Sequence, residues 1–484
     1  MAAIHVLFVA SEAAPLVKTG GLGDVIGSLP PILKELGLKV TVVLPAYRQI
    51  DKQNFRKLEL GPMSAWSSQD WPIDVWQGSL NGCDLYLLGN PVLFERQGLY
   101  SDQLGDFGDN LLRFSFFCRA VIRLSQALNL APDIIHVHDW QTALLPAILQ
   151  TKATAPSPLD KAATILTIHN LAYQGIFTQA QFHLTGLHDT FNHMDGIEYW
   201  GNISTLKAGI VCSDAITTVS PSYAQEIKTP QFGYGMDGIL RDRASDLHGI
   251  LNGVDYAIWN PGSNALLPAN YDAAHLKDKR ICRDHLLDLL ELPPVKGRQA
   301  VLGMVGRLAY QKGLDILVPA LEQILPDHDI RVVVLGAGET YYENMVMDLA
   351  ARYPQKLRLI RRFSEQLAHL VQAGSDMLLM PSLYEPCGLS QLYALRYGTP
   401  PLVRNTGGLR DTVENYAPPG QGTGFVFSGY ATEDLRDSIL AALALFTKTS
   451  AWQALMRRAM RQDFSWEKSA GHYQALYQSL TRRS

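Results

Sequence analysis

The stretch IHVLFVA (residues 4–10), followed at residues 18–24 by KTGGLGD, decides the fold of this chain. The first run is apolar and is typical of a buried strand in a parallel sheet, while the residues after Asp24 are predicted to form a helix that ends at Gly37. A glycine-rich turn between a strand and a helix brings backbone N–H groups close to a phosphate. The stretch therefore predicts a strand, an anion-binding turn and a helix.

The turn also contains two charged residues, Lys18 and Asp24, which bear on the kind of ligand that it could bind. The turn lacks the G-x-G-x-x-G spacing of dinucleotide-binding folds. We therefore expect Lys18 and the N–H groups around Gly21 to contact an anionic ligand without enclosing it, with Asp24 at the N-cap of the helix. A tight turn with a solvated lysine explains this segment, taken alone, equally well.

The composition indicates a soluble protein of several domains. The 484 residues suffice for two or three domains with a core each, and 47% hydrophobic with 18% charged residues is typical of globular proteins. The formal net charge of −4 argues against nucleic acid as a partner, because no basic surface is available to neutralise phosphates.

The cysteines and the apolar runs predict a cytoplasmic protein without a metal site or a membrane anchor. The five cysteines are odd in number and show no CxxC spacing, which favours a reducing compartment and argues against zinc. The first residues lack the charged and apolar regions of a signal peptide, and no apolar run reaches the ~20 residues that cross a bilayer.

Strand and helix patterns alternate in two separate series. Each strand-like run is short and apolar and ends in polar residues or glycine, and helical stretches lie between several of the runs. This predicts an α/β fold with two doubly wound Rossmann-like domains that face a cleft. The runs are IHVLFVA, KVTVVLPA, CDLYLLG, PDIIHVHD, ATILTIHN and AITTVS in the first series, and AVLGMVGR, IRVVVLGAG, KLRLIRR, SDMLLMPS, PPLVRNTGG and GTGFVF in the second.

Turn signals separate the two series around residues 251–300, where Asn-Gly, Asn-Pro-Gly and Leu-Pro-Pro occur. We predict a first domain over residues 1–250 and a second over residues 251–460. Residues 461–484 have aromatic and apolar side chains at helical spacing and are predicted to form a C-terminal helix.

Charged residues in the second series follow strand ends, where ligands bind in open parallel sheets. Arg307 and Lys312 follow the first strand of this series, and both could reach one diphosphate. Glu385 lies in the turn after the run DMLLMPS, three residues before a predicted helix. Beside a diphosphate, such a carboxylate is a candidate for stabilising positive charge on a reacting carbon. Taken singly, each of the three is explained as a solvated surface residue.

The first series supplies polar residues at its own strand ends. His136 and His138 share one face of a strand and could chelate a metal, but no further ligands complete such a site. Asp139 and His169 are better explained as hydrogen-bond partners of a polar substrate, although His169 alone also fits a core histidine. The glycine-rich loop at residues 233–238 (GYGMDG) suits close packing on a hydroxylated ligand, and Asn252 lies in a turn at the domain boundary.

Together these motifs make the chain similar to the bacterial glycogen synthases and plant starch synthases. The resemblance covers essentially the whole chain through KTGGLGD, HVHDW, IHNLAYQG, GYGMDG, GILNGVD, GRLAYQKG and PSLYEPCGLSQLYALRYGTPPLVRNTGGLRDTV. It implies the two-domain GT-B architecture of glycosyltransferases. It also implies transfer of glucose, with retention, from a nucleoside-diphosphate glucose, usually ADP-glucose, to the 4-hydroxyl at the non-reducing end of an α-1,4-glucan, without metal or other cofactor.

The resemblance also assigns roles to residues. Lys18, Arg307 and Lys312 correspond to the cations that contact the donor diphosphate, and Glu385 to the acid beside the transferred sugar. The C-terminal helix is expected to cross back to the first domain, and the second domain to bind the nucleotide sugar. The implied catalytic residues are Glu385, His169, Lys312 and Arg307. The implied substrate-binding residues are Lys18, Gly21, Asp24, Tyr100, Asp139, Asn170, Asn252, Cys387, Gly388, Leu389 and Ser390; Tyr100, and Glu12 beside this set, are weaker correspondences that rest on shorter local matches.

Several alternatives stay open at this point. A nucleotide-sugar epimerase on the same fold and a non-catalytic glucan-binding protein both share parts of the pattern, whereas no segment argues for the pyridoxal-phosphate lysine of a phosphorylase. Retention is compatible with a double displacement or with same-face attack in an ion pair. The choice between ADP-glucose and UDP-glucose, the oligomeric state and the need for a primer do not follow from the sequence.

Overall fold

The computed structural model describes residues 3–61, 63–66, 69–103, 105–297, 299–362, 364–418 and 420–482. The chain divides into two compact units. Unit 1 consists of residues 1–219, 224–253 and 466–484, and unit 2 consists of residues 220–223 and 254–465. The predicted α/β class with two doubly wound domains is confirmed, and each run predicted as a strand contains one.

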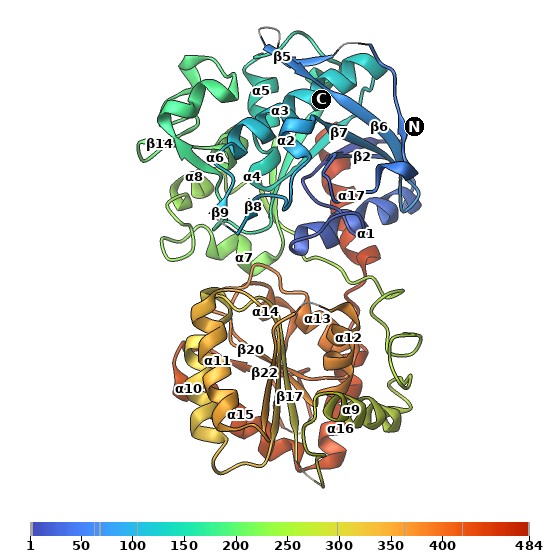
Figure 1. Cartoon of the computed structure of the whole chain (residues 1–484), viewed down its shortest axis with the longest axis vertical. Coiled ribbons are helices and arrows are strands. Elements are labelled where there is room, and N and C mark those ends of the chain that lie inside the picture. Colours follow the sequence, from blue (N-terminus) through green and yellow to red (C-terminus); the bar gives the residue numbers. More distant parts are fainter. Residues whose placement is uncertain are drawn as a thin grey trace. The chain divides into compact units, whose positions relative to one another are not determined.

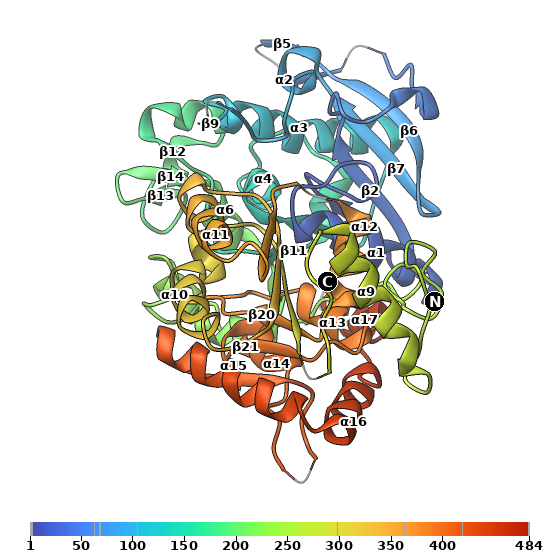
Figure 2. The same cartoon turned by 60° about the horizontal axis from the view of Figure 1, so that its bottom comes forward.

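Unit 1 is built on a nine-stranded sheet in which seven neighbouring strands run parallel. The last two strands, β6 and β3, extend the edge beyond β7 antiparallel, and Figure 2 shows β2, β7 and β6 in succession. The central strands are buried on both faces, as their continuous apolar runs predict. The order is β16 (Leu247–Gly249), β15 (Ala215–Thr218), β11 (Ala163–Ile168), β10 (Ile134–His138), β1 (His5–Val9), β2 (Lys39–Pro45), β7 (Cys83–Gly89), β6 (Asp74–Leu80) and β3 (Arg56–Lys57).

Helices cover this sheet, and one of them comes from the far end of the chain. The C-terminal helix α17, drawn red in Figure 1, lies beside the blue helix α1 in unit 1. Its buried side chains include Tyr473 and Tyr477. The helices of unit 1 are α1 (Gly21–Glu35), α2 (Pro91–Phe94), α3 (Asn110–Leu128), α4 (Asp139–Thr142), α5 (Leu144–Gln150), α6 (Thr205–Cys212), α8 (Asp237–Asp242) and α17 (Trp466–Thr481), and α7 (Pro221–Glu226) is divided between the units.

Unit 1 also contains three small sheets that the sequence did not predict. They join short strands in pairs or threes on loops of the unit. Their strands are β12 (Ile176–Thr178), β14 (Asn202–Ser204) and β13 (Glu198–Tyr199); β4 (Ser64–Trp66) and β5 (Gln69–Pro72); and β8 (Ser101–Asp102) and β9 (Gly105–Asp106).

Unit 2 has a six-stranded, all-parallel sheet between two layers of helices. Helices α10, α11 and α15 lie on one side of it and α9, α12, α13 and α16 on the other (Figure 1). The strand order is β19 (Leu357–Ile360), β18 (Arg331–Leu335), β17 (Val301–Val305), β20 (Met377–Met380), β21 (Pro401–Arg404) and β22 (Phe425–Phe427). The helices are α9 (Lys279–Leu289), α10 (Leu314–Ile324), α11 (Thr340–Arg352), α12 (Glu365–Gly374), α13 (Ser390–Arg396), α14 (Gly407–Thr412), α15 (Thr432–Phe446) and α16 (Thr449–Met460).

The chain passes between the units at four points, and two of these, after Gly253 and after Ser465, are adjacent. In unit 2, Val254 and Ser465 form a parallel bridge, and the Val254 N–H donates to Phe464 O at 2.7 Å. In unit 1, a Cβ on Gly253 would lie 2.5 Å from Cα of Trp466, so this position requires glycine. Among the described residues, no single helix is long and apolar enough to cross a membrane; α15 and α16 pass that test only as a pair, which is bent by 111°.

Candidate active site

In unit 2, the predicted residues Lys312 and Glu385 meet at the carboxyl end of the sheet. Lys312 follows β17 and Glu385 follows β20, and these two strands are paired in the sheet. The Lys312 Nζ donates to Glu385 Oε2 at 2.7 Å. The Glu385 side chain is only 7% exposed, so this ion pair lies in a region that excludes most water and strengthens electrostatic interactions.

The loop that carries Glu385 is held from several sides. Ser382 Oγ donates to Glu385 Oε2 at 2.9 Å, and the Gly408 N–H donates to the Glu385 backbone oxygen at 3.0 Å. The Arg404 guanidinium donates to the carbonyls of Ser382 and Leu383. A carboxylate on a loop fixed in this way is preorganised, because it needs little rearrangement when charge develops near it.

The residues after Glu385 form a glycine turn that leads into α13. Gly388 has a φ of +71°, a conformation that favours glycine, and a Cβ there would displace the Gln391 side chain, whose Oε1 would lie 2.3 Å away. Cys387 is buried, Leu389 is the N-cap of α13, and Ser390 Oγ donates to Val305 O at the end of β17 at 3.3 Å. The predicted set Cys387, Gly388, Leu389 and Ser390 thus borders the same strand end as Lys312.

Arg307 also follows β17, two residues after the strand ends, and its side chain is exposed. It therefore lies on the same edge of the sheet as Lys312 and Glu385. Two cations and the glycine turn at one sheet edge form an environment suited to a diphosphate.

In unit 1, Glu12 organises the predicted glycine turn. Its carboxylate, only 3% exposed as a residue, accepts from the Thr19 N–H at 2.5 Å, from Thr19 Oγ1 at 2.6 Å and from the Gly20 N–H at 3.3 Å. Tyr100 Oη donates to the same carboxylate at 2.6 Å. Tyr100, predicted to bind substrate, therefore contacts the residue that shapes the turn. Burial, followed by the charge of Glu12, raises the pKa of Tyr100 well above its ordinary range, so the phenol stays a donor.

The turn itself differs in one respect from the prediction. Helix α1 begins at Gly21 with Gly20 as its N-cap, so Asp24 is not the capping residue but lies in the first turn of the helix. There its Oδ1 accepts from Lys18 Nζ at 2.6 Å, in a partly exposed ion pair. The negative charge of Asp24 suits the first turn of a helix, and it also holds Lys18 at this helix end.

A second polar group in unit 1 lies where β10 and β11 end. Asp139 follows β10 with a φ of +54°, a strained conformation for a non-glycine residue. Its Oδ1 accepts from the His169 N–H, which follows β11, at 2.7 Å. Burial raises the pKa of Asp139 to about 7, although the hydrogen bond from His169 opposes that shift. Asn170, next to His169, is partly exposed, and its Oδ1 accepts from the Ala172 N–H.

The sequence offered His136 and His138 as a metal-binding pair but did not favour that role. In the structure, both side chains contact other protein groups. His136 Nδ1 lies 2.9 Å from Tyr477 Oη and its Nε2 lies 2.6 Å from Thr167 Oγ1, so both ring nitrogens of His136 are occupied. His138 Nδ1 lies 3.0 Å from His169 Nε2. In the described part of the chain, no three His, Cys, Asp or Glu side chains are placed to hold a metal ion.

Two further parts of unit 1 were predicted to contact a substrate. In the loop at residues 233–238, Tyr234 has a φ of +48° and its carbonyl accepts from Gln174 and Tyr199. Asn252 is buried, and its Oδ1 has no hydrogen-bond partner among the residues that the structure describes.

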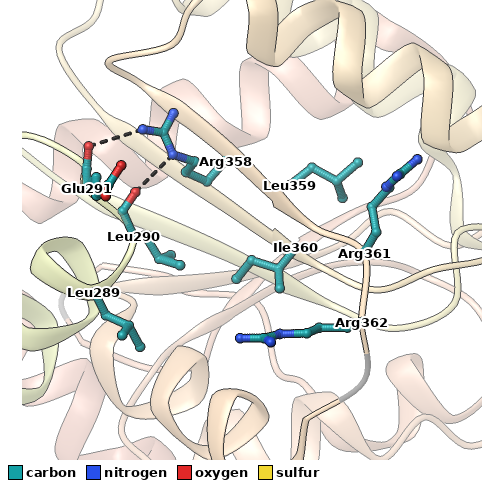
Figure 3. A pocket seen from close by; sticks show the side chains of 8 residues that line it. All are labelled: Leu289, Leu290, Glu291, Arg358, Leu359, Ile360, Arg361 and Arg362. Carbon is teal, nitrogen blue, oxygen red and sulfur yellow. Dashed lines mark hydrogen bonds between the residues drawn. The ribbon is translucent and has the colours of Figure 1, made fainter.

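A separate groove in unit 2, of about 470 Å³, contains none of the predicted residues. It runs along the edge strand β19 and the end of α9 (Figure 3). Arg358 in this groove donates to the carbonyls of Leu290 and Glu291, at 2.9 and 3.2 Å, and so holds the end of α9 against the sheet. The groove is lined by Leu289, Leu290, Glu291, Arg358, Leu359, Ile360, Arg361 and Arg362.

Sequence reasoning missed the roles of Ser382, Arg404, Gly408 and His138. Glu12 was recognised only as a weak correspondence. These side chains and this glycine act on other protein groups, and such partnerships depend on how distant loops fold together. A short motif shows which residues are available but not which carboxylate each donor reaches.

Comparison with known proteins gives matches over both units. Residues 5–242 match the family described as the starch synthase catalytic domain, and residues 292–453 match the family described as glycosyl transferases group 1. Among curated relatives, a glycogen synthase of Myxococcus xanthus is 45% identical over 485 residues, with 99% of each chain covered. A glycogen synthase of Thermotoga maritima is 41% identical over 484 residues, with 98% of each chain covered.

Solved structures agree with these relatives. The catalytic domain of starch synthase IV from Arabidopsis thaliana, bound to ADP and acarbose, superimposes with a TM-score of 0.91 at 31% identity, covering 99% of this chain and 100% of that one. Anabaena HepE in complex with UDP-glucose, at 15% identity and a TM-score of 0.57, covers 98% of this chain and all of its own, and is alike in fold alone.

Proposed function

The chain belongs to the family of bacterial glycogen synthases and starch synthases, and we propose that it transfers glucose from ADP-glucose to the non-reducing-end 4-hydroxyl of an α-1,4-glucan, with retention, elongating glycogen. Its relatives are named glycogen synthases over their full length, and the starch synthase neighbour binds ADP together with acarbose. ADP is the leaving group expected when glucose is transferred from ADP-glucose.

The observation that carries the proposal is the Lys312–Glu385 pair on its rigid loop. Cleavage of the bond between glucose and the diphosphate leaves positive charge on C1 and the ring oxygen, and negative charge on the departing phosphate. In the proposed site, Glu385 stabilises the positive charge. Lys312 gives one ammonium proton to Glu385 and has two more to donate to the diphosphate.

The other groups serve the two substrates. Arg307 and the N–H groups around Gly388 would contact the diphosphate, and Lys18 beside the α1 N-terminus offers a further cation for a phosphate group. Asp139, His169 and Asn170 offer hydrogen-bonding groups for the sugar hydroxyls. Each preorganised donor of this kind is commonly worth about 10²–10³ in rate. Retention is compatible with same-face attack and with a covalent intermediate on a carboxylate.

The activity is tested by incubation of the protein with ADP-[¹⁴C]glucose and glycogen, followed by measurement of polymer-bound label. We expect incorporation that depends on protein, and a kcat/KM for ADP-glucose above that for UDP-glucose. A product whose new linkages give α-anomeric ¹H NMR signals supports retention, whereas β-anomeric signals refute it.

The same assay distinguishes the alternatives. A glucan-binding protein retains glycogen but leaves ADP-glucose intact, and an epimerase converts the nucleotide sugar without labelling the polymer. Equal or better use of UDP-glucose would refute the donor assignment while leaving glucosyl transfer in place.

A further inference from the structure

A buried histidine lies directly behind His169. His138, the last residue of β10, is fully buried, whereas His169 is partly exposed. Their rings are joined through His138 Nδ1 and His169 Nε2, which are 3.0 Å apart. Because a neutral imidazole carries one N–H, one ring must donate and the other accept, and the direction of this bond decides what His169 offers to a substrate.

Both rings are neutral. Burial and the neighbouring histidines hold the pKa of His138 well below its usual range, and burial lowers the pKa of His169 to about 3. Each ring therefore carries a single proton at neutral pH. Two arrangements remain, in which either His169 Nε2–H donates to His138, or His138 Nδ1–H donates to His169.

The second nitrogen of His138 discriminates between these arrangements. His138 Nε2 is buried and has no hydrogen-bond partner among the described residues. If His169 donated, the proton of His138 would sit on Nε2 as a buried donor without an acceptor. If His138 donates, Nε2 is only an unpaired acceptor. Orphaned buried N–H groups are rarer and costlier than unsatisfied acceptors, so the second arrangement is favoured.

We propose that His138 is a positioning residue that donates its Nδ1 proton to His169 Nε2 and so fixes His169 as the Nδ1–H tautomer. His169 then presents an N–H donor, not a lone pair, as its remaining ring nitrogen. Resting on the proposed function, this means that His169 donates to a hydroxyl oxygen of the bound sugar and does not remove a proton from it.

The surroundings of His138 hold its ring in one orientation. Phe8 stacks with it at 13° and 5.7 Å between centroids, and the His136 ring lies 4.3 Å away. Its backbone N–H donates to Thr142 Oγ1 at 2.7 Å. On the other side, the His169 N–H is fixed by Asp139. Other contacts thus hold both imidazole rings in place. The property that they leave open is which of the two facing nitrogens carries the proton.

The tautomer can be read directly by NMR on the whole protein. The chain is labelled with ¹⁵N-histidine, and two-bond ¹H–¹⁵N correlation spectra are recorded near pH 8, with assignment by His138→Asn and His169→Asn. We expect the His169 ring to show a protonated Nδ1 and an unprotonated Nε2. The reverse pattern, or averaging between tautomers, would overturn the proposal. This readout needs no substrate, so it stands even if the protein transfers no glucose.

A pair of variants of matched shape tests the consequence. His138→Asn keeps an amide N–H close to the position of Nδ1, whereas His138→Leu has the same branching but no donor. We expect His138→Leu to lower kcat for glucosyl transfer about 10-fold or more with little change in donor KM, and His138→Asn to recover at least about a third of the wild-type kcat.

The His169 tautomer is measured again in both variants, and circular dichroism checks their folding. Restoration of the Nδ1–H form in the Asn variant and its loss in the Leu variant support the proposal. Equal kcat in the two variants, or an unchanged tautomer in the Leu variant, contradicts it. If both variants misfold, the wild-type spectrum alone decides.

Discussion

Glu385 combines near-complete burial with an ion pair, which makes its charge effective on any atom beside it. If it stabilises charge that develops only in the transition state, Glu385→Gln should lower kcat by about 10²-fold or more while donor KM changes little, because shape is kept and charge is lost. Steady-state kinetics with ADP-glucose measure this, with the exposed Glu433→Gln as a control that should behave as wild type. Retention of more than about a tenth of kcat by Glu385→Gln would contradict the assignment.

The raised pKa of Asp139 predicts that the stability of unit 1 depends on pH. Its pKa of about 7 in the folded chain exceeds the ~3.9 of an unfolded chain, so between these values the folded state holds a proton that the unfolded state has lost. This contribution to stability is therefore present below pH 4 and lost as pH rises to about 7. Asp139→Asn keeps an oxygen for the His169 N–H and removes the ionisation. We expect it to stabilise unit 1 at pH 8 and to change little at pH 4.

Amide hydrogen exchange of β10 and β11, measured at several pH values, checks this expectation. The difference between the variant and the wild type should grow as pH rises and then level off above about 7. A difference that is the same at all pH values would show that Asp139 does not ionise in this range. Loss of transferase activity in the same variant is expected but does not bear on the pH effect.

At the scale of single residues, the side chains of the candidate site in unit 2 could be predicted from the sequence because they follow the ends of parallel strands. Lys312 and Glu385 are 73 positions apart, yet both follow strands that pair in a parallel sheet, so their meeting follows from topology. The roles of Glu12 and His138 were not accessible, because each depends on which donor a loop brings to it. Asp24 was misplaced as the N-cap because the helix begins four residues earlier than the pattern suggested.

Among the elements, the loop between β20 and α13 is shaped by the close approach of α14. A Cβ on Gly408 would lie 2.1 Å from the Cys387 carbonyl oxygen, which is backbone and cannot rotate away. We expect Gly408→Ala to destabilise unit 2 by about 2 kcal/mol or more and to reduce kcat by displacing Glu385. Urea unfolding and kinetics measure the two effects.

The matched control is Gly471→Ala in α17, where a Cβ would meet nothing within 4 Å. Because alanine favours a helix over glycine, this variant should be stabilised by about 0.5–1 kcal/mol and keep full activity. If Gly408→Ala were as stable and active as this control, the packing of α14 on the Glu385 loop would not matter for the site.

The sequence correctly predicted those strands that are buried on both faces of a sheet. The strands of the parallel sheets other than β16 (Leu247–Gly249) lie within the short apolar runs that predicted them, whereas β16 was not predicted. The antiparallel strand β6 (DVWQGSL) and the small sheets on loops were missed. Their residues are partly exposed and mix polar with apolar types, so the sequence does not distinguish them from loops.

At the scale of the whole molecule, α17 belongs to unit 1 although it follows unit 2 in sequence. Tyr473 and Tyr477 are fully buried, and Tyr477 contacts His136 behind the site. We expect a chain that ends at Ser465 to lose hydrogen-exchange protection in β1 and β10 while β17 and β20 stay protected. A chain that ends at Thr481 is the control and should match wild type. Unchanged protection of β10 without α17 would refute this dependence.

The placement of α17 also sets an order of events during synthesis. The ribosome delivers the strands of unit 1 first and the whole of unit 2 next, and only then Trp466–Thr481. Domains usually fold in the order in which they emerge. Here unit 2 can finish while unit 1 still waits for its last helix. A prematurely terminated chain therefore leaves the ribosome with the surface for α17 uncovered, available to chaperones and proteases before it can act on any substrate.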